Sequence, residues 1–147
     1  MIGLVDAYLF LLFASGIFAL ILGYYTWHTF VIQQKMTPAK YFTFLLTCIA
    51  IWSFGSGLAL WFTSNNLTYF CEQWKYLGIV FIPPTWLLLA SSWTGRDRWI
   101  NWKSIFVLYS IPVVSLIIIF TDSIHHLFWQ NIDYIMIGSF VETSVVH

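Results

Sequence analysis

Four long apolar stretches, separated by short polar ones, set the pattern along this chain. They run over about residues 4–31, 41–63, 74–94 and 104–120. A helix needs about 20 residues to cross about 30 Å of hydrocarbon, and flanking aromatic residues such as Trp102 extend the shorter fourth stretch. The second stretch is uncharged throughout, and the third carries Lys75 only at its start. The pattern predicts an all-α, polytopic transmembrane bundle of four helices.

The third stretch contains "GIVFIPPTWLLLASSWTG", residues 78–95, with two adjacent prolines. In a helix, Pro83 and Pro84 cannot donate to the carbonyls of Ile79 and Val80, and their rings bend the helix. Within hydrocarbon those carbonyls need a partner from a neighbouring helix, a side chain or water. We therefore expect this face of the third span to be buried in protein, near a polar group or a cavity.

Two residues that follow the prolines, Thr85 and Trp86, offer a hydroxyl group and an indole N–H. Two interpretations of the bend stay open at this point. In the first, the kink only shapes the bundle. In the second, it lines a ligand pocket or serves as a hinge.

Charge predicts the orientation of the spans. Five of the six basic residues lie in the two loops that join spans one to two and three to four: Lys35, Lys40, Arg96, Arg98 and Lys103. In the loop between spans two and three, the single basic residue Lys75 is offset by Glu72. Because loops rich in Lys and Arg stay in the cytoplasm, the N-terminus and the segment after span four are expected outside.

Composition supports the membrane interpretation. Hydrophobic residues make up 60% of the chain and charged residues 8%, against about 25% charged in soluble domains. The mean hydropathy is +0.80. Aromatic residues make up 21%, with nine Trp, as expected where rings anchor at membrane interfaces. The net charge is zero, so no basic field indicates nucleic acid as a partner.

Small residues at helical spacing predict where the spans contact one another, because lipid supplies no hydrophobic drive between helices. They are Ser15, Ala19 and Gly23 in the first span, and the pairs Ser53 with Gly57 and Gly55 with Ala59 in the second.

Catalytic chemistry is missing from the sequence. Apart from Asp6 near the start of the first, the predicted spans contain no acid, and the chain has no phosphate loop, no Cys/His metal quartet and no nucleophile with a placed base. We predict that the chain is not an enzyme and binds no cofactor or metal. The lack of an ionisable residue within a span also argues against a transporter. Cys48 and Cys71 are predicted to differ in height by about 20 Å, too far for a disulfide.

The segment after span four contains "TDSIHHLFWQNID". Adjacent histidines on a helix diverge, and His125 and His126 lack two further metal ligands nearby. We interpret them, with Phe128 and Trp129, as an extracytoplasmic interface anchor rather than a metal site.

Three stretches resemble one known family: "AIWSFGSGLALWF" (50–62), "FCEQWKYLGIVFIPPTWLLLASSWTGRDRWI" (70–100) and "TDSIHHLFWQNI" (121–132). Their order and spacing are similar to the N-terminal seven-helix sensor region of bacterial membrane histidine kinases. That region shows a Trp in span two, a "YLGI…PPxW…TG" span three followed by basic residues, and a "HHLFW"-like element after span four. The matching residues are Trp52, Tyr76, Leu77, Gly78, Pro83, Pro84, Trp86, Thr94, Gly95, Arg96, Arg98, His125, His126, Leu127, Phe128 and Trp129.

The resemblance implies a single transmembrane sensor domain over residues 1–147, which holds the first four of seven spans, with residues 121–147 as an extracytoplasmic segment. It places the chain in the bacterial inner membrane, with the lipid bilayer and downstream kinase domains as partners. A homodimer would form through the parent protein, whose output is a histidine kinase or, in some relatives, a diguanylate cyclase. The stimulus, a small molecule or a membrane property, stays open.

Residues proposed for ligand binding or a hinge are Pro83, Pro84, Thr85, Trp86 and Trp52. The alternative is an autonomous four-helix membrane protein, acting as a small carrier or an assembly subunit.

The orientation can be tested with reporter fusions. Fusions after Gln34 and after Arg98 should report a cytoplasmic position, and fusions after Asn65 and after Asn131 an external one, because the basic loops fix the topology. Alkaline phosphatase and green fluorescent protein activities measure this directly. A cytoplasmic signal at Asn65 would overturn the orientation.

Overall fold

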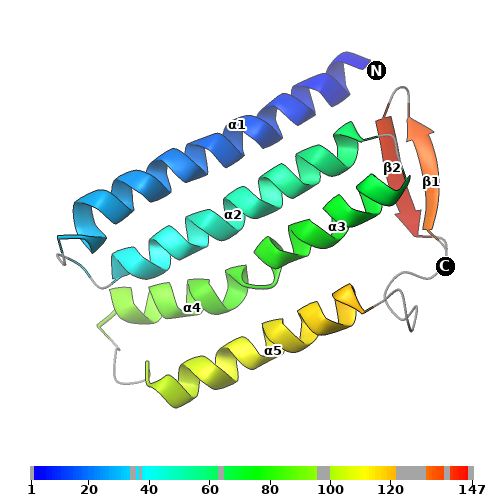
Figure 1. Cartoon of the computed structure of the whole chain (residues 1–147). Helices are drawn as coiled ribbons and strands as arrows, with labels where there is room; N and C mark the ends of the chain where they lie inside the picture. Colours follow the sequence, from blue (N-terminus) through cyan, green and yellow to red (C-terminus); the bar gives the residue numbers. More distant parts are fainter. Residues whose placement is uncertain are drawn as a thin grey trace.

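The computed structural model describes residues 2–33, 36, 38–62, 65–95, 100–121, 132–137 and 140–145. Within these residues the elements, in chain order, are α1 (Ile2–Thr26), the π-helical turn η1 (Trp27–Val31), α2 (Pro38–Trp61), α3 (Asn65–Ile79), α4 (Ile82–Trp93), α5 (Trp102–Phe120), β1 (Ile132–Ile137) and β2 (Phe140–Val145). The helices lie side by side as a row of antiparallel spans (Figure 1).

Four helical segments are long and apolar enough to cross a membrane, which confirms the predicted all-α transmembrane bundle. They are Asp6–Val31, Pro38–Trp61, Leu67–Trp93 and Trp102–Phe120. The third combines α3 with α4, and it starts at Leu67 rather than near Trp74. Glu72 and Lys75 therefore lie within the helical span and not in the loop before it.

The antiparallel row gathers the starts of α2 and α5 at one end of the bundle, beside the ends of η1 and α4 (Figure 1). Lys40 lies in the first turn of α2 and Lys103 in the first turn of α5. The other basic residues of these loops, Lys35, Arg96 and Arg98, lie outside the described residues. The arrangement agrees with the charge argument, since both loops return to the same end.

A two-stranded antiparallel hairpin follows the fourth span, a feature that the hydrophobic pattern did not predict. Ile132 pairs with Val145 and Ile137 pairs with Phe140. β2 contacts α2 at the end of the bundle opposite to the basic loops (Figure 1). The segment "IDYIMI" is rich in β-branched and aromatic residues, a composition that favours strands.

Two phenylalanine–glycine contacts hold α1 against α2. The ring of Phe54 lies 3.1 Å from the position of a Cβ on Gly16, and the ring of Phe13 lies 3.0 Å from that on Gly57. The two rings also contact one another, with centroids 6.0 Å apart. Each ring therefore fills the gap that the opposite glycine leaves, and a Cβ at either glycine would require that ring to shift by a few tenths of an ångström.

A serine pair adds a polar link to the same interface. The hydroxyls of Ser15 and Ser53 are 2.8 Å apart, and Ser53 is almost completely buried. Ala19 and Ala50 form a small core with Leu46 beside this pair. Ser15, Ala19 and Ser53 thus mark the α1–α2 contact, as predicted for small residues, whereas Gly55 faces α3.

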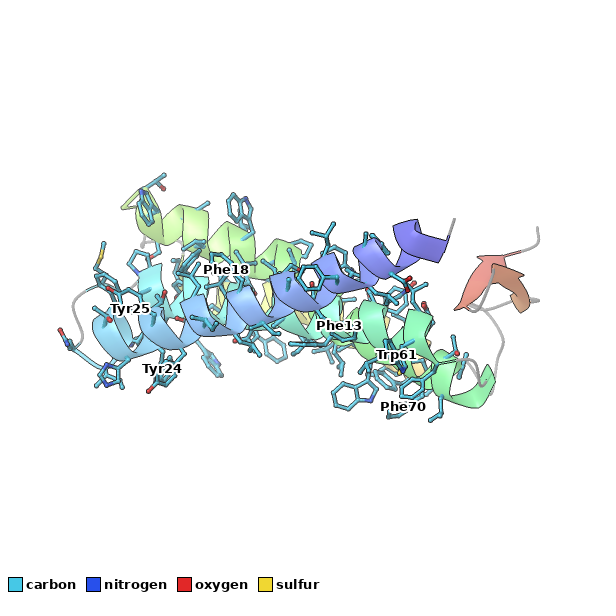
Figure 2. The ribbon with its side chains drawn as sticks, turned by 90° about the horizontal axis from the view of Figure 1, so that it is seen from above. Phe13, Phe18, Tyr24, Tyr25, Trp61 and Phe70 are labelled. Atoms are coloured by element: carbon cyan, nitrogen blue, oxygen red, sulfur yellow. The ribbon has the colours of Figure 1, made fainter. Side chains whose placement is uncertain are left out.

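Aromatic side chains cover the outward faces of the bundle. Figure 2 shows Phe18 and the pair Tyr24 and Tyr25 along α1, and Trp61 and Phe70 near the opposite end. All five are exposed in the chain. Rings near both ends of the spans suit the two headgroup regions of a bilayer.

A close approach of two backbones joins α2 to α3. A Cβ on Gly78 would overlap the carbonyl oxygen of Cys48 and lie 2.8 Å from the backbone nitrogen of Trp52. About one helical turn after Trp52 on α2, a Cβ on Gly55 would lie 2.9 Å from the Cβ of Lys75. The contacts at both points involve the backbone of the facing helix, so a residue with a Cβ fits there only if one helix shifts.

Gly78→Ala should destabilise the protein by about 1–3 kcal/mol, because the added methyl group overpacks a backbone contact that cannot give way. Gly23→Ala is the matched control, since its Cβ would meet the Leu46 Cβ at an ordinary 3.6 Å. Unfolding in mixed micelles titrated with sodium dodecyl sulfate measures both. Equal stability of the two variants would contradict the close contact.

Candidate functional site

The third span is broken rather than bent. α3 ends at Ile79 and α4 begins at Ile82, with a turn at Val80 and Phe81. The N–H of Val80 donates to Tyr76 O at 3.1 Å, and the N–H of Phe81 donates to Gly78 O at 3.3 Å, the latter a tighter turn than an α-helix makes. The break thus lies just before the two prolines.

Pro83 and Pro84 fall in the first turn of α4. At this position a helix does not use its N–H groups internally, and the fixed φ of proline suits the start of a helix. The sequence analysis expected a kink within one continuous helix. The structure instead uses the prolines to start a new helix.

The hydroxyl of Thr85 pairs with a side chain on α5, not with the carbonyls of Ile79 or Val80. The side chain is fully buried, and its hydroxyl lies 2.9 Å from the hydroxyl of Tyr109 on α5. The ring of Tyr109 stacks on Phe81 in the break at 5.8 Å between centroids. Phe44 of α2 contacts both rings, at 6.3 Å from Phe81 and 6.5 Å from Tyr109. One tyrosine on α5 therefore contacts both the turn and the first part of α4.

A second bond links α5 to the other side of the break. The side-chain amide of Gln73 on α3 donates to the carbonyl oxygen of Ile119 at 3.3 Å. Ten residues separate Tyr109 from Ile119, about 15 Å along a helix. α5 therefore bridges the break, bound to α3 near the outer end and to α4 further in.

A groove runs along this bridge. It has a volume of about 350 Å³ and is lined by Val80, Pro83, Pro84, Leu87, Leu108, Ile111, Pro112 and Ser115. Pro112 lies inside α5, so prolines from both helices face the same space. An open groove therefore lies beside the prolines, with Pro84 buried and Pro83 exposed.

The two tryptophans proposed for the site do not line this groove. Trp86 is 60% exposed and faces away from the interior of the bundle. Trp52 is also exposed, and its backbone rather than its indole faces Gly78. The structure brings Pro83, Pro84 and Thr85 together with α5, and it leaves Trp86 and Trp52 outside.

An ion pair within the third span was missed by the sequence analysis. Glu72 is buried, and its carboxylate contacts the ammonium group of Lys75 one helical turn away. The Lys75 ammonium also lies 5.9 Å from the centre of the Tyr76 ring. The prediction that the spans contain no acid is therefore wrong, because α3 begins at Asn65 and carries these polar residues into the bundle.

The two side chains together carry no net charge, which lowers the free-energy cost of burying them in a membrane. Either charge buried alone would have a higher free-energy cost. The spacing of Glu72 and Lys75 in the sequence could have predicted this ion pair, because residues three apart lie on the same face of a helix. Ionisable groups inside a span mark functional sites by default. We therefore add Glu72, Lys75 and Gln73 to the candidate site.

Two other predictions concern cysteine and metal chemistry. Cys48 and Cys71 are both buried and unpaired, as expected. Among the residues that the structure describes, no three His, Cys, Asp or Glu side chains come together in a group that could hold a metal ion. The predicted interface anchor of His125, His126, Phe128 and Trp129 lies outside the described residues.

Fold and site together define a polytopic α-helical membrane protein with a broken third span and a charged pair inside the bundle. Comparison with known families then gives the identity of the region. The family described as the N-terminal 7TM region of histidine kinase matches residues 11–147, so the chain belongs to that family. No curated protein and no solved structure matches the chain.

Glu72→Leu should destabilise the protein by about 2–3 kcal/mol, because it leaves the Lys75 ammonium unpaired within a span. The double variant Glu72→Leu, Lys75→Leu should recover most of this loss, since no charge is left without its partner. Unfolding in mixed micelles measures the wild type, the single variants Glu72→Leu and Lys75→Leu, and the double variant. If the double variant is as unstable as the sum of the two single variants, the pair is not a coupled unit.

Proposed function

We propose that this chain is the sensory input module of a two-component histidine kinase in a bacterial inner membrane. It receives a signal from outside the cell or from the membrane and passes it to cytoplasmic kinase domains in the parent protein. The family match supports this role, because the 7TM region is the sensory part of such kinases and is not itself catalytic. A homodimer of the parent, and a kinase rather than a diguanylate cyclase output, belong to the same proposal.

The observation that carries the mechanism is the broken third span bridged by α5. α3 is fixed to α2, because its backbone rests on that of α2 at Gly55 and Gly78. α4 is a separate short helix whose path can change at the turn formed by Val80 and Phe81. Hinges of this kind are a few residues at the end of an element that absorb a change of backbone angles.

Movement of α4 would change the contacts of Tyr109 with α4 and with the turn. A rotation at the turn separates the Tyr109 hydroxyl from Thr85 or its ring from Phe81, which now lie 2.9 Å and 5.8 Å away. α5 would then shift relative to α3, where Gln73 holds it at Ile119. A signal that acts on the outer half of the bundle can thus reach the end of α4 that the charge pattern places in the cytoplasm.

In this mechanism the charged pair lies on α3, the helix that stays fixed to α2. Glu72 and Lys75 neutralise one another on α3, close to the glycine contact with α2. The pair also removes one argument against a transporter, namely the lack of an ionisable residue in a span. Membership in the histidine kinase family nevertheless favours the sensory role over the autonomous carrier or assembly subunit.

Pro83→Ala with Pro84→Ala, made in the full-length parent, should lock the output on or off at normal membrane levels. The two alanines restore N–H donors to Ile79 O and Val80 O and favour one continuous helix, where each interior proline costs about 3 kcal/mol. Autophosphorylation in native membranes, across growth conditions that change the wild-type output, measures the effect.

Pro38→Ala at the start of α2 is the control, and it should respond as wild type because that proline lies far from the break. Trp86→Ala should also change the response little, since its exposed indole does not line the groove. A double variant that accumulates normally and still follows the wild-type response would show that the break is not a hinge.

A further inference from the structure

Three prolines meet at the groove between α4 and α5, and each removes a hydrogen-bond donor from the carbonyl four residues before it. The carbonyls concerned are those of Ile79, Val80 and Leu108. Val80 and Leu108 themselves line the groove. Near hydrocarbon a carbonyl without a donor is costly, and it needs water, a side chain or a ligand.

Leu108 is the clearest case. Pro112 lies in the interior of α5, so the lost bond belongs to the middle of a helix and not to its end. Val80, in contrast, belongs to the turn between two helices, where carbonyl groups commonly lack α-helical partners. The groove therefore presents a backbone acceptor from the interior of a membrane helix.

The remaining lining defines what can occupy this space. The eight lining residues carry no charge, and seven of them are apolar or proline. The exception, Ser115, donates its hydroxyl hydrogen to Ile111 O at 3.0 Å, so its oxygen is left as an acceptor. The side chains thus offer apolar surface and acceptors, but no cation, anion or free hydroxyl hydrogen.

The volume of about 350 Å³ lies at the small end of the range for ligand sites, about 300–1,000 Å³. A helix is too wide for such a space, at about 10 Å across. A plain acyl chain would fill it but would leave the Leu108 carbonyl without a donor. A molecule with an apolar body and one O–H or N–H group satisfies both requirements.

We propose that the groove binds a small, uncharged amphiphile, an alcohol or amide, whose hydrogen-bond donor pairs with the carbonyl oxygen of Leu108. This inference rests on the proposed sensory function, because an occupant between α4 and α5 would act on the two helices that meet at the hinge. Binding itself is measured without any signalling output, so the two proposals can fail separately.

The test uses the whole chain in nanodiscs of phosphatidylethanolamine and phosphatidylglycerol. Two photoreactive probes are compared, an octanol that carries a diazirine on its chain and the matching diazirine octane without the hydroxyl. Mass spectrometry maps the labelled peptides. The alcohol should label residues 80–87 and 108–115, unlabelled 1-octanol should compete, and the alkane should show no preference for these peptides.

Pro112→Ala returns an N–H donor to Leu108 O, so the affinity for the alcohol should fall about three- to tenfold, the effect of one hydrogen bond. Ser115→Leu fills the groove and should abolish site-specific labelling by the alcohol. Pro38→Ala, away from the groove, should label as wild type. Equal labelling by alcohol and alkane, or an unchanged affinity in Pro112→Ala, would overturn the proposal.

If the alcohol binds as described while an occupied groove leaves kinase output unchanged, the ligand site stands and its link to the hinge is refuted. If labelling fails while the Pro83→Ala, Pro84→Ala variant locks the output, the hinge stands without this ligand.

Discussion

The backbone contact between α2 and α3 is the constraint on which the rest of the structure depends. At Gly78 the third span rests on the backbone of Cys48 and Trp52, and at Gly55 the second span rests on Lys75. In a membrane, helices gain stability from such close contacts, because lipid competes equally well for apolar side chains. These two points fix the register, and the register draws Glu72 and Lys75 into the bundle.

The break in the third span lies beside this contact. α3 and α4 both contact α2, and Pro83 and Pro84 favour a new helix start where the chain turns between them. The turn interrupts the helix within the span. α5 forms a hydrogen bond on each side of this interruption, to α4 through Tyr109 and to α3 at Gln73. The backbone contact at Gly78 and the break two residues later give the span two halves, and the proposed mechanism lets the second half move relative to the first.

Much of this fold could be predicted from the sequence, because hydrophobic length and charge in loops are strong signals in membranes. The four spans and the small-residue contact at Ser15 and Ser53 are present in the structure. The family resemblance, carried by separated motifs, is confirmed by the match over residues 11–147.

What the sequence did not reveal depends on pairing between distant residues. Hydropathy treats Glu72 and Lys75 as a loop, since it scores each charge alone and cannot see that the two neutralise one another. Tyr109 and Gln73 carry no motif, and their roles arise only from where α5 lies. Trp86 matched the family pattern, yet its position on the helix turns it outward. The hairpin lacked a hydrophobic signal because short strands resemble loops in a membrane sequence.

The most direct measurement is disulfide formation between the second and third spans, in a chain without Cys48 and Cys71. If α3 carries Lys75 into the bundle, Lys75→Cys should form a disulfide with Gly55→Cys, because the Cβ positions are 2.9 Å apart and a separation of the two helices by about 1 Å gives the about 3.8 Å that a disulfide needs. It should not form one with Trp61→Cys, six residues or about 9 Å further along α2. A cross-link to residue 61 but not to residue 55 would place Lys75 at the end of the span and contradict the register on which this account depends.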